Sequence, residues 1–291
     1  MRILEYAKIT ADFFCLRRDR PLILGLVITD ICNLSCLHCR VHNIFRRHLP
    51  WGVVGKVLRD QHGSGARFLY LEGGEPLLWQ DGERRLPDVI GLAREIGFLK
   101  VHLYTNGTIP LDSSPDFTWV SVDGLPETYQ TIRRGSFSRV WNNIRRGPRP
   151  LAIIFTINTL NWREIPAFLE LVRDDLPGVR VNFYFHTPYY GFDFLLPSPF
   201  LKRQVAETLL SLKQSGLPVM NSVSGLRALA AVTFRRPLRF TRVVDQAGEY
   251  QCCRAVGNPE VCRFCGYSTC AELALLQDFH TGVVQEAMRL F

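Results

Sequence analysis

The sequence has no apolar run long enough to cross a membrane. A membrane-spanning helix needs about 20 consecutive apolar residues, whereas the longest apolar runs, 22–28 and 151–157, have the length of strands. The first residues carry charged side chains and show no apolar stretch followed by a small-residue cleavage site. We therefore expect a cytoplasmic protein, whose nine cysteines stay reduced and, being clustered, favour metal ligation over disulfides.

Acidic residues are in the minority. The 291 residues include 35 Lys and Arg against 27 Asp and Glu, which gives a formal net charge of +8. Basic clusters stand at 46–48, 145–146 and 235–242. Such a balance favours an anionic partner, which is a phosphorylated or carboxylated substrate, an anionic lipid surface or RNA; a solvated basic face explains it equally well. No dedicated nucleic-acid module is present, so nucleic acid is not the expected partner.

Three cysteines stand within eight residues, at Cys32, Cys36 and Cys39. Three thiolates at this spacing can each bind one iron of a cubane 4Fe-4S cluster and leave the fourth iron open to a substrate or cofactor. A partial zinc site is the alternative. The loop follows the apolar, β-branched run 22–28, so it is predicted to leave the C-terminal end of a buried strand, where parallel α/β folds carry cofactor sites.

From these cysteines onward the chain resembles the radical S-adenosylmethionine (radical SAM) superfamily, whose loop has the pattern Cys-x3-Cys-x2-Cys. Alone, each further matching segment would be an ordinary turn, but they follow predicted strands in the family's order, over roughly residues 20 to 190. They are Glu72-Gly73-Gly74-Glu75-Pro76, Thr105-Asn106-Gly107, Ser121-Val122-Asp123-Gly124 and Arg133-Arg134-Gly135.

The resemblance implies a 4Fe-4S cluster on the three cysteines and S-adenosylmethionine bound beside it. The cofactor-positioning residues that it implies are Gly73, Gly74, Glu75, Asn106, Ser121, Asp123 and Arg134, with Arg133 as the alternative to Arg134.

Predicted strands at 22–28, 67–71, 100–104, 117–122, 151–157 and 179–185 alternate with helical patterns such as 87–96, 137–145 and 164–174. This alternation predicts a parallel α/β sheet with right-handed crossovers. The resemblance identifies it as a partial (β/α)6 TIM-type barrel, open at the side. We divide the chain into an N-terminal helix at 1–20, which packs on the barrel or lies on an anionic membrane, the barrel at 21–200, and a small cysteine-rich C-terminal extension at 201–291.

Five cysteines cluster in the C-terminal extension, at Cys252, Cys253, Cys262, Cys265 and Cys270. Four thiolates, from Cys262, Cys265, Cys270 and either Cys253 or Cys252, are enough for one further metal site. Auxiliary clusters of radical SAM enzymes are similarly placed after the barrel. A second 4Fe-4S cluster is the preferred interpretation, and a structural zinc is the alternative.

The substrate is the least defined part of the sequence-based interpretation. Tyr184, His186, Tyr189 and Asp193 follow the last predicted strand and are candidates for a substrate pocket, although the aromatic residues fit a core equally well. With the basic clusters, they favour an amphiphilic or acidic, lipid- or isoprenoid-like substrate. Peptide or cofactor maturation is one alternative, and a non-catalytic, metal-stapled RNA-binding module is another. Expected partners are a small-molecule or lipid-like substrate, an electron donor such as flavodoxin or ferredoxin, and peripheral membrane contact.

Overall fold

The computed structural model describes residues 9, 20–39, 41–189, 191, 193–253, 255–278, 280 and 282–283. The N-terminal helix predicted at 1–20 therefore falls almost entirely outside the described residues. In the part of the chain that the structure describes, no helix combines the length and the apolar character that crossing a membrane requires.

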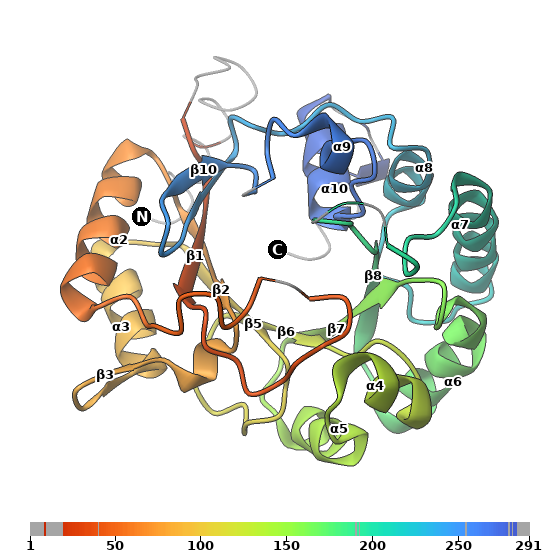
Figure 1. Cartoon of the computed structure of the whole chain (residues 1–291), viewed down its shortest axis with the longest axis horizontal. Helices are drawn as coiled ribbons and strands as arrows, with labels where there is room; N and C mark the ends of the chain where they lie inside the picture. The colour runs from red at the N-terminus through yellow and green to blue at the C-terminus, as the bar shows by residue number, and fades with distance from the viewer. Residues whose placement is uncertain are drawn as a thin grey trace.

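A parallel sheet with helices around its outer side forms the body of the molecule (Figure 1). The spatial strand order is β10-β9-β1-β2-β5-β6-β7-β8, and only β10 is antiparallel to its neighbour. The strands are β1 (Ile23–Thr29), β2 (Phe68–Gly73), β5 (Lys100–Thr105), β6 (Phe117–Ser121), β7 (Leu151–Ile157), β8 (Arg180–Phe185), β9 (Thr241–Val244) and β10 (Glu249–Gln251), with a separate hairpin of β3 (Gln80–Asp81) and β4 (Arg84–Arg85).

The helices are α2 (Trp51–Ser64), α3 (Leu86–Ile96), α4 (Pro126–Arg133), α5 (Phe137–Arg146), α6 (Ile165–Asp175), α7 (Pro199–Gln214), α8 (Val223–Ala231), α9 (Pro259–Cys262) and α10 (Ser268–Gln277), with the short 3-10 helices η2 (Pro76–Leu78) and η3 (Trp162–Glu164). Each of the six predicted strands is present, five of them with small shifts at the ends. The predicted partial TIM-type barrel is confirmed.

Two hydrophobic clusters hold the helices on the sheet. One packs β1, β2 and β5 against α2 and α3, with Leu58 and Trp79 fully buried in it. The other packs β6, β7 and β8 against α5 to α8, around Phe155, Phe168 and Phe183. Because parallel strands covered on both faces are buried throughout, β1 and β7 read as continuous apolar runs in the sequence.

The segment after residue 200 is part of the same sheet. Strand β9 pairs in parallel with β1, with Ile23 opposite Thr241. On the far side, Phe185 N–H of β8 donates to Gly266 O at 2.9 Å, and Val219 forms a bridge with Val181. Helix α10 lies between these two edges (Figure 1). The opening that we expected at the side of the barrel is therefore covered by the C-terminal cysteine-rich segment.

His102 on β5 lies inside the barrel in an aromatic stack. Its ring stacks on Tyr70 at 4.8 Å between centroids, and its Nδ1 accepts from Trp119 Nε1 at 3.3 Å. Burial lowers the pKa of His102 to about 4. The Asp116 carboxylate opposes this shift, and the positive charge of Lys100 reinforces it. The imidazole is therefore neutral in the folded protein over the physiological range.

A histidine whose pKa is depressed by folding stabilises the protein above the unfolded pKa of about 6.5, and this stability is lost as the pH falls toward the folded value. We expect the wild type to lose about 2 kcal/mol of unfolding free energy through His102 between about pH 7 and pH 5. His102→Phe should show a loss smaller by that amount in urea denaturation at the two pH values. An identical loss in both proteins would mean that folding does not lower the pKa of His102.

Candidate cofactor and substrate site

The three-cysteine loop follows β1 and is held by backbone hydrogen bonds. The Asp30 carboxylate accepts from the N–H groups of Arg46 at 3.1 Å and Arg47 at 2.8 Å. Asn43 bonds both the N–H and the C=O of Cys32, and Leu37 N–H donates to Ile132 O of α4 at 2.7 Å. These hydrogen bonds therefore hold the loop at the C-terminal edge of the sheet.

Gly73 and Gly74 let the end of β2 pack directly on the start of this loop. Gly74 N–H donates to Thr29 O and Glu75 N–H to Ile31 O, both at 2.8 Å. A Cβ atom on Gly74 would lie 2.4 Å from Ile31 O, and one on Gly73 would lie 2.1 Å from Thr29 O. The glycines are thus required by the chain's own backbone, and Gly73 also lines the cavity described below.

The Glu75 carboxylate points into the protein. It accepts from Leu77 N–H at 3.0 Å, Thr105 Oγ1 at 2.8 Å and Asn106 N–H at 2.7 Å, and the residue is fully buried. Burial raises its pKa to about 6 although these hydrogen bonds act in the opposite direction. Glu75 therefore joins the ends of β2 and β5.

This placement gives Thr105 a measurable role. Thr105→Val keeps the shape of the side chain but removes a buried hydrogen bond to a carboxylate, which should cost about 1.5–3 kcal/mol of unfolding free energy. Thr131→Val, which removes the Oγ1 bond to Glu127 O on the exposed side of α4, is the control and should change stability by under about 0.5 kcal/mol. Equal stabilities of the two variants in urea denaturation would mean that Glu75 is not bonded to Thr105.

Asn106 connects the end of β5 to the cysteine loop. Its Nδ2 donates to Asn33 Oδ1 at 2.9 Å and approaches Cys32 Sγ at 3.7 Å, while its Oδ1 accepts from Thr108. The side chain is buried and does not line the cavity. Asn106 is therefore placed to orient Cys32.

Asp123 and Arg133 form a buried ion pair under the loop. Arg133 Nε donates to Asp123 Oδ2 at 2.6 Å, and Asp123 Oδ1 accepts from Thr156 N–H at 2.6 Å. Cys36 Sγ lies 3.7 Å from the carbonyl oxygen of Arg133. Arg134, in contrast, is exposed in a left-handed conformation at the end of α4. Of the two arginines, the structure places Arg133 beside the cysteines and Arg134 on the surface.

His38 belongs to the cysteine loop and faces His186 after the end of β8, and the sequence analysis did not single it out. Its Nε2 is 3.7 Å from Asp123 Oδ2, and its ring meets that of His186 edge to face at 6.4 Å. Its Nδ1 is buried without a hydrogen-bond partner. His186 Nε2 in turn bonds Asp193 Oδ2 at 2.8 Å. The predicted His186 and Asp193 thus act as a pair, with only His186 lining the cavity.

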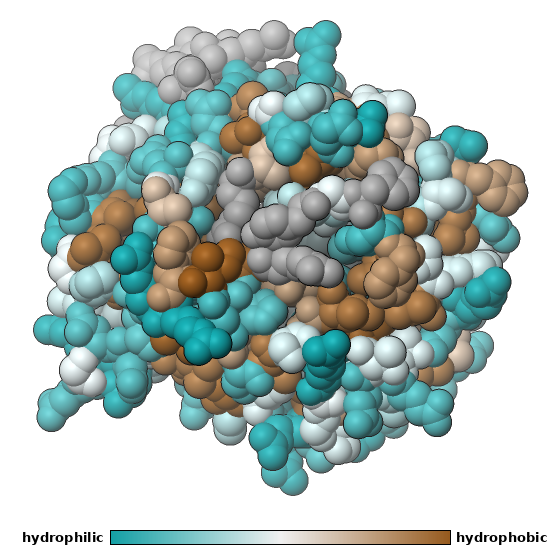
Figure 2. All heavy atoms as spheres, in the orientation of Figure 1, coloured by the Kyte–Doolittle hydropathy of each residue, from teal (hydrophilic) through white to brown (hydrophobic). Residues whose placement is uncertain are grey.

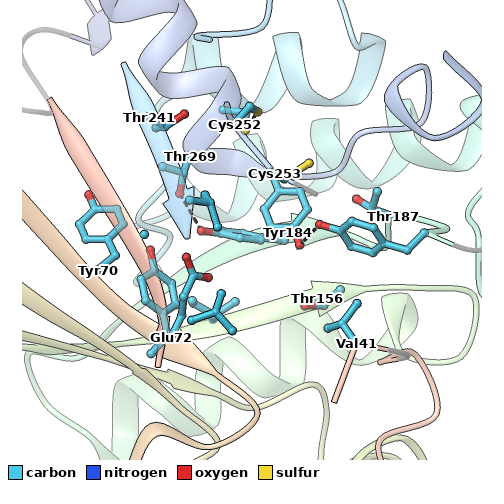
Figure 3. Close-up of a pocket in the computed structure, with 18 of the residues that line it drawn as sticks. Val41, Tyr70, Glu72, Thr156, Tyr184, Thr187, Thr241, Cys252, Cys253 and Thr269 are labelled. Atoms are coloured by element: carbon cyan, nitrogen blue, oxygen red, sulfur yellow. Dashed lines mark hydrogen bonds between the residues drawn. The ribbon is translucent and has the colours of Figure 1, made fainter. Parts of the chain in front are cut away.

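A cavity of about 350 Å³ opens inside the barrel (Figure 3). Cys39 of the loop and Cys252, Cys253 and Cys270 of the C-terminal segment all line it. Of the predicted cofactor and substrate residues, it is lined by Gly73, Ser121, Tyr184, His186 and Tyr189. Gly74, Glu75, Asn106, Asp123, Arg134 and Asp193 are not among its lining residues.

Four further lining side chains were not among the predicted site residues. Tyr70 and Glu72 come from β2, Tyr104 from β5 and Tyr267 from the segment before α10. Tyr184 Oη bonds Thr269 Oγ1 at 2.7 Å, and Tyr189 bonds Tyr267. Residues two apart in a strand face the same side, so the alternation that places Tyr70 and Glu72 together was a usable signal.

The five C-terminal cysteines line one small pocket. Cys252 Sγ lies 3.6 Å from Cys270 Sγ, and Cys262 Sγ lies 3.6 Å from Ala255 O. Thiol contacts also link Cys252 to Cys253 and Cys265 to Cys270. In the described residues, no group of three or more His, Cys, Asp or Glu side chains is arranged to hold a single metal ion. The soft sulfur donors, five in one pocket, are the ligand type that iron–sulfur clusters use.

Comparison with known proteins agrees with this geometry. The model of the radical SAM superfamily matches residues 26–172. Fe-coproporphyrin III synthase of Methanosarcina barkeri is 30% identical over 202 residues, which are 63% of this chain and 48% of that protein. A probable GTP 3',8-cyclase of Methanothermobacter marburgensis is 33% identical over 171 residues, 53% of this chain and 55% of that protein. The chain thus spans about half the length of these curated relatives.

Among solved structures, Streptococcus suis SuiB bound to its precursor peptide SuiA superposes with a TM-score of 0.66 at 13% identity, covering 95% of this chain and 68% of that one. At this identity the likeness shows a shared fold. The family match covers half of the chain and includes the three-cysteine loop. The protein is therefore a member of the radical SAM superfamily.

Proposed function

We propose that this chain is an enzyme that cleaves S-adenosylmethionine reductively and directs the resulting 5'-deoxyadenosyl radical at a substrate in the barrel cavity. Cys32, Cys36 and Cys39 would hold a 4Fe-4S cluster, which would supply the electron for this cleavage when bound. The observation that carries the proposal is that Cys39 lines the cavity together with the ends of the strands. Cofactor and substrate would therefore meet in one enclosed space.

The chain's own residues prepare this space. Asn106 and Asn43 orient Cys32. The Arg133 guanidinium places a positive charge close to Cys36, where it would compensate the negative charge of a thiolate-bound cluster. The hydroxyls of Ser121 and Thr156 line the cavity and can bond a nucleoside. Because the cavity lies inside the barrel, its walls would keep water away from a radical.

The substrate that fits best is amphiphilic, with its apolar part in the cavity. Five tyrosines line the space together with aliphatic side chains such as Ile154 and Val243. Tyrosines provide large apolar surfaces with a few hydroxyl contacts. No lysine or arginine is among the described lining residues, so an acidic group on the substrate would lie outside the cavity.

The outer surface supports the same substrate class. Figure 2 shows hydrophobic residues interrupting a largely hydrophilic face, and the exposed apolar side chains include Ile44, Phe45 and Phe194. Ile44 and Phe45, next to Arg46 and Arg47 in the chain, would suit brief contact with an anionic membrane surface. A flavodoxin or ferredoxin remains the proposed electron donor.

A second candidate is the maturation of a tetrapyrrole cofactor. The similarity to Fe-coproporphyrin III synthase and, at 31% identity over 195 residues, to the AdoMet-dependent heme synthase of Methanosarcina barkeri favours it. The cavity volume of about 350 Å³ is at the lower end for ligand pockets, which favours the slimmer amphiphile.

We further propose that the C-terminal cysteines hold a second 4Fe-4S cluster. Cys262, Cys265 and Cys270 would be three of its ligands, and Cys252 or Cys253 the fourth. Both members of the adjacent pair line the main cavity as well as the small pocket. A centre there would lie next to the substrate.

The test is formation of 5'-deoxyadenosine, measured by mass spectrometry after anaerobic reconstitution with S-adenosylmethionine and a strong reductant. The variant with Cys32, Cys36 and Cys39 all changed to alanine is the control. We expect the nucleoside from the wild type alone. If a reducible cluster is present and no nucleoside forms, with or without isoprenoid or tetrapyrrole candidates, the proposal is wrong.

A further inference from the structure

Lys202 of α7 is a buried cation beside the C-terminal cysteines. Only 3% of the residue is exposed. Its Nζ donates to Phe264 O at 3.4 Å and lies 5.5 Å from the centroid of the Phe185 ring. Burial lowers the pKa of Lys202 to about 8, whereas a negative charge on Cys265 acts in the opposite direction. A buried charge is costly unless an opposite charge compensates it.

Arg236 is a second cation beside the C-terminal cysteines. Its guanidinium donates to the carbonyl oxygen of Cys262, and its Nη1 is buried with no hydrogen-bond partner. It lines the small pocket with the five cysteines. The negative charges that act on it are those of Cys265, Cys262, Cys270 and Cys252 when ionised.

Among the described residues, no carboxylate forms an ion pair with Lys202 or Arg236, and the negative charges that act most strongly on both are those of thiolates. Neutral thiols would leave two cations uncompensated, and the buried Nη1 unsatisfied. Thiolates that carry a metal centre with a net negative charge would compensate both. The pocket is therefore electrostatically matched to an anionic metal–thiolate centre.

We propose that Lys202 and Arg236 are positioning residues that stabilise the reduced, more negative state of an iron–sulfur centre at the C-terminal cysteines. The inference rests on the proposed second cluster. Reduction adds one negative charge to such a centre, and nearby positive charge makes that step more favourable. Removing either cation should thus lower the reduction potential of the centre.

The experiment uses the full chain with Cys32, Cys36 and Cys39 changed to alanine, so that any remaining iron–sulfur signal comes from the C-terminal site. Lys202→Gln and Arg236→Gln are made in this background and titrated by EPR against a redox mediator series. Lys202→Arg, which keeps the charge, and Arg203→Gln, which removes an exposed charge one residue away on the same helix, are the controls.

Each Gln variant should shift the ratio of reduced to oxidised centre about tenfold toward oxidised at a fixed potential, which is about 59 mV for one electron. Both controls should shift it by less than about twofold. Arg236 is only half-buried, so its variant gives a result even if Lys202→Gln does not fold. An unchanged potential in Arg236→Gln with iron retained, or zinc in place of iron, overturns the inference. Formation of 5'-deoxyadenosine by the unmodified chain would still support the proposed enzyme in either case.

Discussion

Replacing Asp123 by alanine should lower the free energy of unfolding by about 3–5 kcal/mol, because it leaves the buried Arg133 guanidinium without its partner. Asp123 is fully buried and also accepts from Thr156 N–H, so the variant loses a second buried bond. The loop should loosen as well, since Arg133 stands directly beside Cys36. Urea denaturation and iron content after reconstitution measure the two effects.

The matched control is Arg145→Ala, which breaks the exposed pair between Arg145 and Asp175. Exposed pairs contribute about 0–1 kcal/mol, so this variant should remain close to the wild type. A loss of less than about 1 kcal/mol in Asp123→Ala as well would contradict the buried pair as the structure has it.

The second large effect is expected at Gly266. A Cβ atom there would lie 1.7 Å from the carbonyl oxygen of Phe185, and that atom belongs to the backbone of β8. Neither the Phe185 segment nor the Gly266 segment can move away without breaking the hydrogen bond from Phe185 N–H to Gly266 O. We expect Gly266→Ala to cost about 3 kcal/mol or more and to displace the adjacent Cys265.

Iron content after reconstitution distinguishes this displacement from general unfolding. Gly266→Ala should lose the iron of the C-terminal site and keep that of the three-cysteine loop. Gly91→Ala, in helix α3 with open space around the added methyl group, should bind as much iron as the wild type and gain about 0.5–1 kcal/mol. Full iron in Gly266→Ala would show that the C-terminal cysteines do not depend on docking against β8.

The barrel strands could be predicted from the sequence because the apolar pattern that indicates each strand lies within the strand itself. Strand β7 is a continuous apolar run, and the structure gives it the predicted bounds. Strand β9 was missed because it is four residues long, contains Arg242 and exists through its pairing with β1. That pairing joins residues more than 200 positions apart, which no local pattern encodes.

The candidate site divides in the same way. The order of motifs located the cysteine loop and the strand ends, but it did not tell which side chains face the cavity. Glu75 and Asp123 are conspicuous in the sequence and yet bond to the protein's own backbone. The choice between Arg133 and Arg134 depends on how α4 ends, where one residue turns the side chain from the core to the surface. The members of the radical SAM superfamily are enzymes, so the family match disfavours the non-catalytic RNA-binding alternative.

Our central proposal is that the two cysteine sites each hold an iron–sulfur cluster, and iron stoichiometry with EPR on the reconstituted protein tests it most directly. We expect about eight irons per chain in the wild type and about four after the alanine changes at Cys32, Cys36 and Cys39. We expect about four, with a different EPR signal, after the same change at Cys262, Cys265 and Cys270. About four irons in the wild type, all of them lost with the first three cysteines, would contradict it.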